Sequence, residues 1–254
     1  MATRKTKTLR DVTTVSTIGT DKFVPITDGN GNVTKVSLAS LKSALLGGID
    51  LESVNDNVFI MYHQKSDDFP LAVKTSKWAS LQSSGEIADG VLVMDGDKFI
   101  VVAPTEATLN WSSADVSGGG TTTSDRVTAF ADFNGKQNTA SQITHNECSG
   151  TSYAPGYCHS YSRANANGQG LTAGKWWLPS MGELMVIYAN MKKINYALSL
   201  ISGASQLVEA GYWSSTEASA SFAWYLYLDD GYAATWSPKP SVQRRVRPVS
   251  AFIS

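Results

Sequence analysis

The fold is decided by the stretch GYWSSTEASASFAWYLYLDDGYAATW, residues 211–236. In its second half, strongly apolar residues alternate with amphipathic or charged ones. The apolar set is Phe222, Trp224, Leu226 and Leu228, and the intervening set is Tyr225, Tyr227 and Asp229. Successive side chains of a β-strand point to opposite faces, so this period of two predicts a strand whose apolar set faces the core.

The pair Asp230-Gly231 predicts the two-residue turn of a β-hairpin. Such a turn fixes three cross-strand pairs: Asp229 with Tyr232, Tyr227 with Ala234, and Tyr225 with Trp236. The face opposite the core would then gather four rings, those of Tyr225, Tyr227, Tyr232 and Trp236. A contiguous exposed aromatic cluster is typical of a binding surface. The alternative is that another segment covers this face and makes the same rings part of the core.

Composition limits the class of protein. The 254 residues, of which 42% are hydrophobic, are enough for one or two domains with a sizeable core. A formal net charge of −1 gives no field that would concentrate a polyanion, so we expect no nucleic-acid partner. No apolar run approaches the roughly 20 residues of a membrane span, and the N-terminus lacks the apolar segment of a secretory signal. We therefore expect neither membrane insertion nor secretory export.

The sequence divides into residues 1–48, 49–87 and 88–254. In the first part, two apolar runs flank the turn-rich residues 28–32, which indicates a hairpin, and residues 38–46 have the spacing of a helix. A hairpin and helix of this size bury little surface alone, so we interpret this part as an assembly module. Residues 49–87 are interpreted as a connecting segment without an assigned role.

The third part contains a second hairpin, a loop and a helix. Residues 88–104 form two β-rich runs around Asp95-Gly96-Asp97, which predicts the hairpin, and the Gly/Ser/Thr-rich residues 112–125 predict an exposed loop. Ser180 and Glu183 form the S-x-x-E pattern of a capping box, which predicts the start of a helix. We expect one helix, whose apolar face consists of Leu184, Ile187, Met191 and Ile194. Lys192 and Lys193 are expected near the end of this helix.

Little in the sequence points to catalysis. It lacks the serine nucleophile elbow and the His-Glu-x-x-His zinc motif. His145, Cys148, Cys158 and His159 form H-x2-C-x9-C-H, which carries zinc-ligand residue types at an unusual spacing. A zinc site, a local disulfide and two free thiols are all open readings of the two cysteines. We expect no enzyme activity, no catalytic residues and no cofactor.

Several ordered blocks in the C-terminal part resemble a known family. They are WWLPSMGEL (176–184), GYWSSTE (211–217), A-W-x-L-x-L (223–228), Asp230-Gly231 and RVRPVSAF (245–252). Together they resemble the C-type-lectin-fold variable proteins of diversity-generating retroelements, which include receptor-binding tail proteins of phages. The resemblance covers residues 88–254. It implies an α+β fold with a C-type-lectin-like (formylglycine-generating-enzyme-like) C-terminal domain.

In that family, reverse transcription varies codons of the terminal segment, and the varied side chains cluster on one ligand-binding face. The resemblance implies fixed residues, called the frame positions below: Trp213, Ser214, Ser215, Trp224, Leu226, Gly231, Arg245, Val246, Arg247 and Pro248. It also implies variable, ligand-binding residues between them, called the contact positions below: Ala218, Ser219, Ser221, Phe222, Tyr225, Tyr227, Asp229, Tyr232, Ala234, Trp236, Pro238, Pro240, Ser241 and Val242.

Residues 21–45 resemble the start of phage tail or fibre proteins, where such a segment attaches to the virion. The two resemblances imply a non-enzymatic receptor-binding tail protein, assembled in the host cytoplasm and located in the virion. Its partners would be a bacterial surface receptor, either protein or glycan, other tail proteins and further copies of itself in a homotrimer. The alternatives are a bacterial cell-surface adhesin of the same fold and a formylglycine-generating-type oxidase that uses Cys148 and Cys158.

Overall fold

The computed structural model describes residues 23–27, 33–37 and 57–252 of the chain. The chain divides into two compact units, residues 1–48 and residues 49–254. In the first unit, β1 (Phe23–Thr27) and β2 (Val33–Ser37) form an antiparallel hairpin. This confirms the first predicted hairpin. The helix predicted over residues 38–46 lies outside the residues that the structure describes.

The second unit is of the mixed α+β class, as the sequence predicted, and is rich in antiparallel strands. Its first five-stranded sheet has the order β14-β6-β5-β3-β4. The strands are β3 (Val58–His63), β4 (Pro70–Val73), β5 (Ala88–Asp95), β6 (Lys98–Val102) and β14 (Val249–Ala251). β5 and β6 form the second predicted hairpin, with Asp95 opposite Lys98 and Gly96 at a φ of 58° in the turn.

The described residues of the segment interpreted as a connecting segment, 57–87, contribute two strands to this sheet. β3 pairs with β4 on one side and with β5 on the other, and every residue of β3 is buried. α2 (Thr75–Ser83) follows β4 and buries Trp78 completely. The predicted domain start at Ala88 therefore falls inside the first sheet. A strand that is buried on both faces lacks the alternation by which it would be recognised in the sequence.

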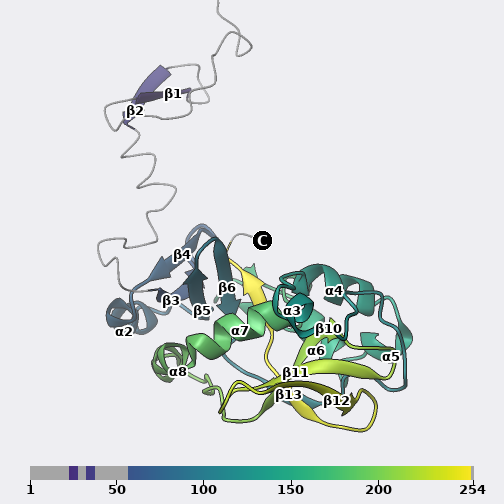
Figure 1. The fold of residues 1–254 in the computed structure, drawn as a ribbon. Helices are drawn as coiled ribbons and strands as arrows, with labels where there is room; N and C mark the ends of the chain where they lie inside the picture. Colours follow the sequence, from purple (N-terminus) through teal and green to yellow (C-terminus); the bar gives the residue numbers. More distant parts are fainter. Residues whose placement is uncertain (1–22, 28–32, 38–56, 253–254) are drawn as a thin grey trace, which may run out of the picture. The chain divides into compact units, whose positions relative to one another are not determined.

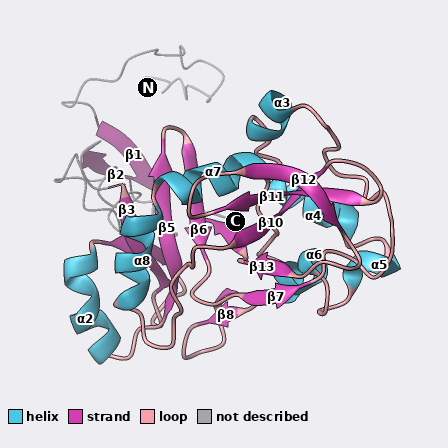
Figure 2. Cartoon of the chain, turned by 60° about the horizontal axis from the view of Figure 1, so that its bottom comes forward, coloured by secondary structure: helices cyan, strands magenta, loops and turns pink. Residues whose placement is uncertain are grey.

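The second five-stranded sheet has the order β12-β11-β10-β13-β7 (Figure 2). Its strands are β7 (Ala107–Leu109), β10 (Gly211–Glu217), β11 (Phe222–Tyr227), β12 (Ala233–Pro238) and β13 (Arg244–Val246). β10 runs parallel to β13, and the other neighbouring pairs are antiparallel. β10 is the central strand, and all of its residues are buried.

Short elements occupy the long connection between β7 and β10. They are α3 (Arg126–Phe130), α4 (Gly135–Gln142), α5 (Asn146–Ser149), α6 (Ala154–Ser160), β8 (Arg163–Ala164) and β9 (Gly170–Leu171). α4 packs against β10 and α6. These helices therefore cover a face of the second sheet.

The single helix predicted after Ser180 is two helices, α7 (Met181–Ala189) and α8 (Met191–Ser199). The predicted capping box is present, and Glu183 accepts a hydrogen bond from the backbone N–H of Ser180 at 2.8 Å. The helix breaks at Asn190, whose amide donates to the Val186 carbonyl at 2.9 Å. The two lysines expected near the helix end therefore lie in the first turn of α8. In the described part of the chain, no helix is long and apolar enough to cross a membrane.

Two hydrophobic clusters lie on opposite faces of the second sheet. The larger one joins both sheets through α7, which lies between them (Figure 1), and takes Trp224 and Leu226 from β11. The smaller one takes Trp213 and Tyr225 from the same sheet and packs them against the covering helices and Trp111. Because both faces of the sheet are covered, alternate side chains of β10 and β11 enter two different hydrophobic clusters. The alternation therefore does not distinguish buried residues from exposed ones.

A buried ion pair fastens the loop after β7 to this sheet. Lys239 Nζ pairs with Glu217 Oε2, and both side chains are fully buried. Lys239 also donates to the Val116 carbonyl at 2.7 Å, while Gly118 N–H donates to Glu217 at 2.9 Å. The ammonium lies 4.2 Å from the centroid of the Trp111 ring. The loop predicted over residues 112–125 is thus tied down, although many of its residues are exposed.

Removing one partner of this ion pair should be costly. In Lys239→Ala, the carboxylate of Glu217 would be buried without a counter-ion, so we expect a loss of about 3 kcal/mol or more in the free energy of unfolding. The double variant Lys239→Met/Glu217→Gln removes both charges and should recover most of that loss. Urea denaturation followed by tryptophan fluorescence measures both. A loss below about 1 kcal/mol in Lys239→Ala would contradict the pairing.

A second prediction concerns pH. Burial raises the pKa of Glu183 from its ordinary 4.5 to about 7, against hydrogen bonds from Ser180 and Trp177 that lower it. The native state therefore keeps a proton that the unfolded state releases, and stability should fall as pH rises through this range. Between pH 5 and pH 8 the wild type should lose on the order of 2 kcal/mol more than Glu183→Gln. Parallel pH profiles of the two proteins would contradict this assignment.

Candidate functional site

Four aromatic rings run from the core to the surface of the terminal hairpin. Trp213 contacts Tyr225 at a centroid distance of 6.1 Å, Tyr225 contacts Tyr227 at 5.7 Å, and Tyr227 lies 6.3 Å from Tyr232. Trp213 is fully buried, Tyr225 is 6% exposed, Tyr227 is half-buried and Tyr232 is 50% exposed. We call these four rings the aromatic ladder. It links a fixed interior to a solvent-facing end.

The cross-strand register differs from the predicted one. Tyr225 lies opposite Ala234, not Trp236, and the tip is a loop of residues 228–231 between Tyr227 and Tyr232, not a two-residue turn. Gly231 has a φ of 76° in this loop. The register also shifts between Ala223 and Tyr225. The longer loop and this irregularity together move β12 relative to the predicted pairing, because each added residue displaces the partners that follow.

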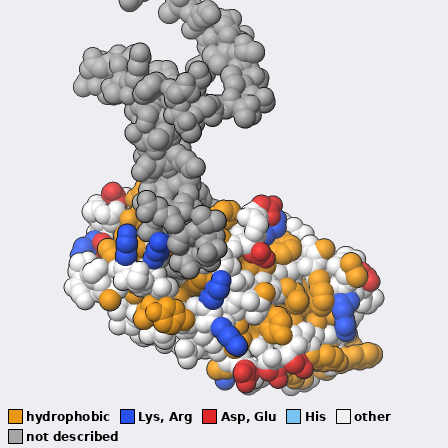
Figure 3. Space-filling view, turned by 60° about the vertical axis from the view of Figure 1, so that its left-hand side comes forward, with side chains coloured by type: hydrophobic (Ala, Val, Ile, Leu, Met, Phe, Trp, Pro, Cys, Tyr) orange, Lys and Arg blue, Asp and Glu red, His pale blue; other side chains and the backbone are white. Residues whose placement is uncertain are grey.

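The predicted exposed face is therefore only partly present. Trp236 is 78% exposed and Tyr232 is half-exposed, as expected of a contact surface. Tyr225 and Ala234, by contrast, are buried in the smaller cluster. The expectation that Tyr225 points to solvent is wrong, because the helices α5 and α6 and the residue Trp111 supply a second core on that side. Figure 3 shows how hydrophobic side chains gather toward one end of this unit.

Apart from Tyr225, Ala234 and Trp236, the contact positions fall into two groups at opposite ends of the hairpin. The tip group, near the 228–231 loop, consists of Tyr227, Asp229 and Tyr232. The base group lies where Phe222 faces Pro238, and it consists of Ala218, Ser219, Ser221, Phe222, Pro238, Pro240, Ser241 and Val242. A strand rises about 3.3 Å per residue, so the two groups are roughly 15 Å apart. Trp236 lies between them on β12.

The base group is held by hydrogen bonds to the neighbouring loop. Ser221 donates to the carboxylate of Asp115 at 2.7 Å, and the Ser221 carbonyl accepts from the backbone N–H of Lys239 at 3.0 Å. The Asn110 amide donates to the Pro240 carbonyl. Most base-group residues are half-buried, and Ser241 is exposed. This end thus offers a mixed surface of apolar residues and three serines, whereas the tip offers two tyrosine rings and a carboxylate.

Sequence reasoning missed Arg244, which lies against the aromatic ladder. Its guanidinium carbon lies 3.4 Å from the centroid of the Tyr225 ring. The ring centroids of Trp213 and Tyr227 are farther away, at 5.5 Å and 5.4 Å. Arg244 Nε donates to Ser237 Oγ at 3.0 Å. The signal in the sequence was the run of basic residues before Arg247. Only the pairing of β13 beside β10 shows which arginine reaches the rings.

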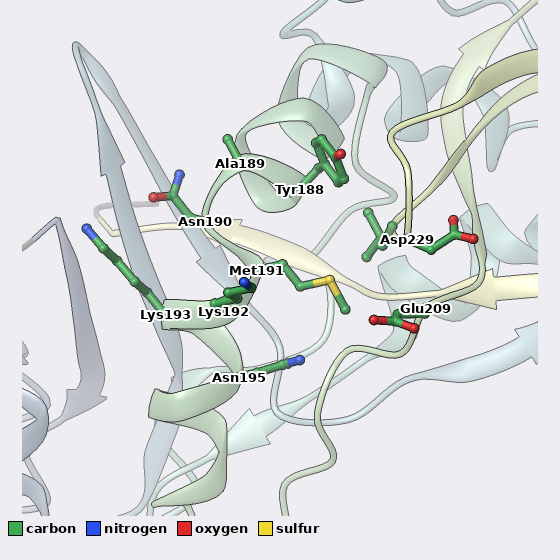
Figure 4. A pocket seen from close by; sticks show the side chains of 10 residues that line it. Tyr188, Ala189, Asn190, Met191, Lys192, Lys193, Asn195, Glu209 and Asp229 are labelled. Carbon is green, nitrogen blue, oxygen red and sulfur yellow. The ribbon is translucent and has the colours of Figure 1, made fainter.

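Two pockets open beside the hairpin tip. The larger, of about 550 Å³, lies between the tip loop and the start of α8. Figure 4 shows Glu209 and Asp229 on one side of the pocket and Lys192 and Lys193 at the start of α8 on the other, with the Lys193 side chain pointing away from the two carboxylates. The smaller, of about 310 Å³, is lined by Tyr227, Arg244 and Arg245 among others, and Glu209 borders both pockets. Exposed rings, a held guanidinium and charged walls can together bind a ligand.

The cysteines are free thiols, which was one of the three open readings. Burial raises the pKa of Cys148 to about 12 and raises the pKa of Cys158 well above its usual value. Both thiols belong to the smaller hydrophobic cluster. Among the described residues, no group of three or more His, Cys, Asp or Glu side chains is arranged to hold a metal ion. The local disulfide is thus excluded.

Comparison with known proteins finds little similarity. No protein-family model matches the chain, and no curated protein sequence matches it. Among solved structures, the chain is similar to a fimbrial protein from Bacteroides ovatus, with 14% sequence identity and a TM-score of 0.41. The similarity covers 90% of this chain and 48% of that protein, so the chain spans about half of its length.

The ladder makes a direct prediction about stability. Tyr225→Ala should cost about 3 kcal/mol or more, because it empties a packed site between Trp213 and Arg244. Trp236→Ala should change the free energy of unfolding by no more than about 0.5 kcal/mol, because its ring is 78% exposed. Thermal and urea unfolding measure the pair. Equal costs for the two variants would show that the burial assigned to these rings is wrong.

Proposed function

We propose that the chain is a non-enzymatic receptor-binding protein that contacts its target through the terminal hairpin. In this proposal the second unit is a C-type-lectin-fold variable domain of the diversity-generating retroelement type. The first unit attaches the protein to a phage tail. The protein assembles in the host cytoplasm, acts in the virion as a homotrimer, and binds a protein or glycan on a bacterial surface.

One observation carries this proposal: burial separates the frame positions from the contact positions. Every frame position is buried except Gly231 and Arg245, which are half-buried. Every contact position is half-buried or exposed except Tyr225 and Ala234. A surface that must accept different side chains needs an interior that does not depend on them. The separation supports a diversified binding site more than a site with fixed chemistry.

The chemistry of the exposed residues agrees with binding. Tyr and Trp give a large contact area at a low cost in side-chain entropy, and they are enriched among residues that dominate binding energy. Tyr232 and Trp236 are such residues, and both are exposed. They belong to a hairpin whose other side chains pack into a hydrophobic cluster on each face of the sheet. A rigid base reduces the entropy lost on binding. Copies in a trimer would add avidity.

The state of the cysteines supports a non-enzymatic role over the oxidase alternative. The thiolate is the form of cysteine that acts as a nucleophile and binds metals. With a pKa of about 12, Cys148 stays protonated at neutral pH, and burial acts in the same direction on Cys158. Both side chains are fully buried. These residues are better explained as packing.

A cell-surface adhesin is the second candidate, because the same hairpin surface would serve on a bacterium as well as on a virion. The two differ in location and in gene context. Co-sedimentation of the protein with purified phage particles supports the tail assignment, whereas labelling on intact cells of the producing strain supports the adhesin. A nearby near-copy of the terminal coding sequence that differs only at adenines would support diversification. Its absence, together with the absence of a reverse-transcriptase gene, removes that part of the proposal.

The binding surface itself is tested by paired variants. Trp236→Ala and Tyr232→Ala should each weaken binding to target cells at least tenfold without unfolding the protein, since both rings are exposed. Phe69→Ala is the matched control, because Phe69 is an exposed ring outside the hairpin. Binding is measured by flow cytometry of fluorescent protein on a panel of bacterial strains. Loss of binding in the control alone, or in none of the three, would refute the hairpin as the contact surface.

A further inference from the structure

Arg244 is held in place but keeps hydrogen-bonding capacity unused. Its guanidinium is stacked on Tyr225, and Nε and Nη2 both donate to Ser237 Oγ. Nη1 has no hydrogen-bond or ion-pair partner among the described residues. No carboxylate of the described chain pairs with this guanidinium, in contrast to Arg247, which pairs with Glu106 at 2.8 Å. A guanidinium fixed in this way has already lost the side-chain freedom that binding would otherwise cost.

The position of Nη1 is set by Gly211. A side chain at residue 211 would collide with Nη1, so the glycine provides the space in which the guanidinium lies. Gly211 and Arg244 both line the 310 Å³ pocket, together with Thr108 and Gln243, which add a hydroxyl and an amide. Fixed donors at the wall of an open pocket are suited to a planar anion, because the guanidinium fork matches the two oxygens of a carboxylate.

The surrounding charges and rings narrow the choice of ligand. Arg245 also lines the pocket, but it is partly neutralised by Glu106 at 3.4 Å. Glu209 lies at the border with the larger pocket and opposes long or multiply charged anions. Tyr227 forms another wall, and Tyr232 continues the ladder outward. The site therefore offers one cationic fork next to apolar ring faces, which suits a single carboxylate on a compact ring.

We propose that the pocket of Gly211, Tyr227 and Arg244 binds a carboxylate-bearing sugar of the uronic-acid class. The carboxylate lies on the Arg244 fork, and the C–H face of the sugar ring packs on Tyr227 and Tyr232. This inference rests on the proposed binding function of the hairpin, and it names the class of target. Arg244 belongs neither to the contact positions nor to the frame positions, so it would select for acid whichever residues the contact positions hold.

The test compares a sugar acid with its uncharged ester, and with a peptide that carries the same acidic group. Isothermal titration of the full chain uses galacturonic acid, its methyl ester and a blocked single-glutamate peptide, so that each acidic probe carries one carboxylate. The acid should bind at least tenfold more tightly than the ester, because esterification removes the charge-assisted hydrogen bonds. The difference should shrink as salt is raised. Equal binding of acid and ester, or no binding of the acid, would overturn the proposal, and equal or tighter binding of the peptide would overturn the assignment to a sugar.

Two variants locate the effect. Arg244→Gln removes the charge, and Gly211→Ala keeps every charge but displaces Nη1, which is the end of a flexible side chain. Arg244→Gln should abolish the preference for acid over ester, and Gly211→Ala should weaken it, while urea unfolding checks that each variant remains folded. A preference that survives in both folded variants would overturn the site. If the acid fails to bind while Trp236→Ala still loses cell binding, this inference fails and the proposed function stands. If Trp236→Ala also binds cells normally, the proposed function fails as well.

Discussion

The buried ion pair of Lys239 and Glu217 is the constraint on which the terminal segment depends. It joins the end of β10, the residue after β12 and the loop after β7 at one point. Two charges out of water are tolerable because they meet each other, and because the Lys239 ammonium and Glu217 Oε2 each also find a backbone partner. Burial lowers the pKa of Lys239, while the hydrogen bond and charge of Glu217 raise it. The base of the hairpin is fixed there, independently of the residues that the hairpin exposes.

A hairpin fixed in this way can carry side chains that contribute nothing to folding. Trp224 and Leu226 anchor it to one core, and Tyr225, which contacts Trp213 of β10, anchors it to the other. The residues left over are free to serve contact, and Trp236 is the most exposed large hydrophobic residue of the described chain. The aromatic ladder joins these two roles in one row, since its inner rings are packed and its outer ring is open. Arg244 lies along that row and gives the surface a fixed charge.

Much of the fold follows from local sequence signals. Alternation identified β11, the Asp95-Gly96-Asp97 turn identified the β5–β6 hairpin, and S-x-x-E identified the start of α7. Each of these depends on residues close together in the chain. The break at Asn190 was missed because the apolar spacing continues through it, and its contacts come from Val186 and from the distant Asn57.

The candidate site was less predictable, since it depends on contacts between distant segments. Alternation predicted the right strand but the wrong cross-strand partners, because a four-residue loop and a register shift are not visible in a period of two. Tyr225 has the pattern of an exposed residue, yet it is covered by segments around Trp111, Cys148 and Cys158, which show no periodicity. The positions of Arg244 and Glu209 at the site could not be predicted, because they depend on the pairing of β13 with β10 and on the path of the loop before β10.

A complete substitution scan of residues 211–248 measures whether the frame positions, and not the contact positions, hold the fold together. Every single variant would be displayed on the surface of yeast and sorted by its resistance to a protease that cleaves unfolded chains. No target is present, so the readout reports folding alone. We expect Tyr232, Trp236 and the base group to accept most residues, and Trp213, Trp224, Tyr225 and Lys239 to accept few. Equal intolerance at Trp236 and Trp213 would contradict this expectation, because the exposed rings would then be part of what holds the fold together.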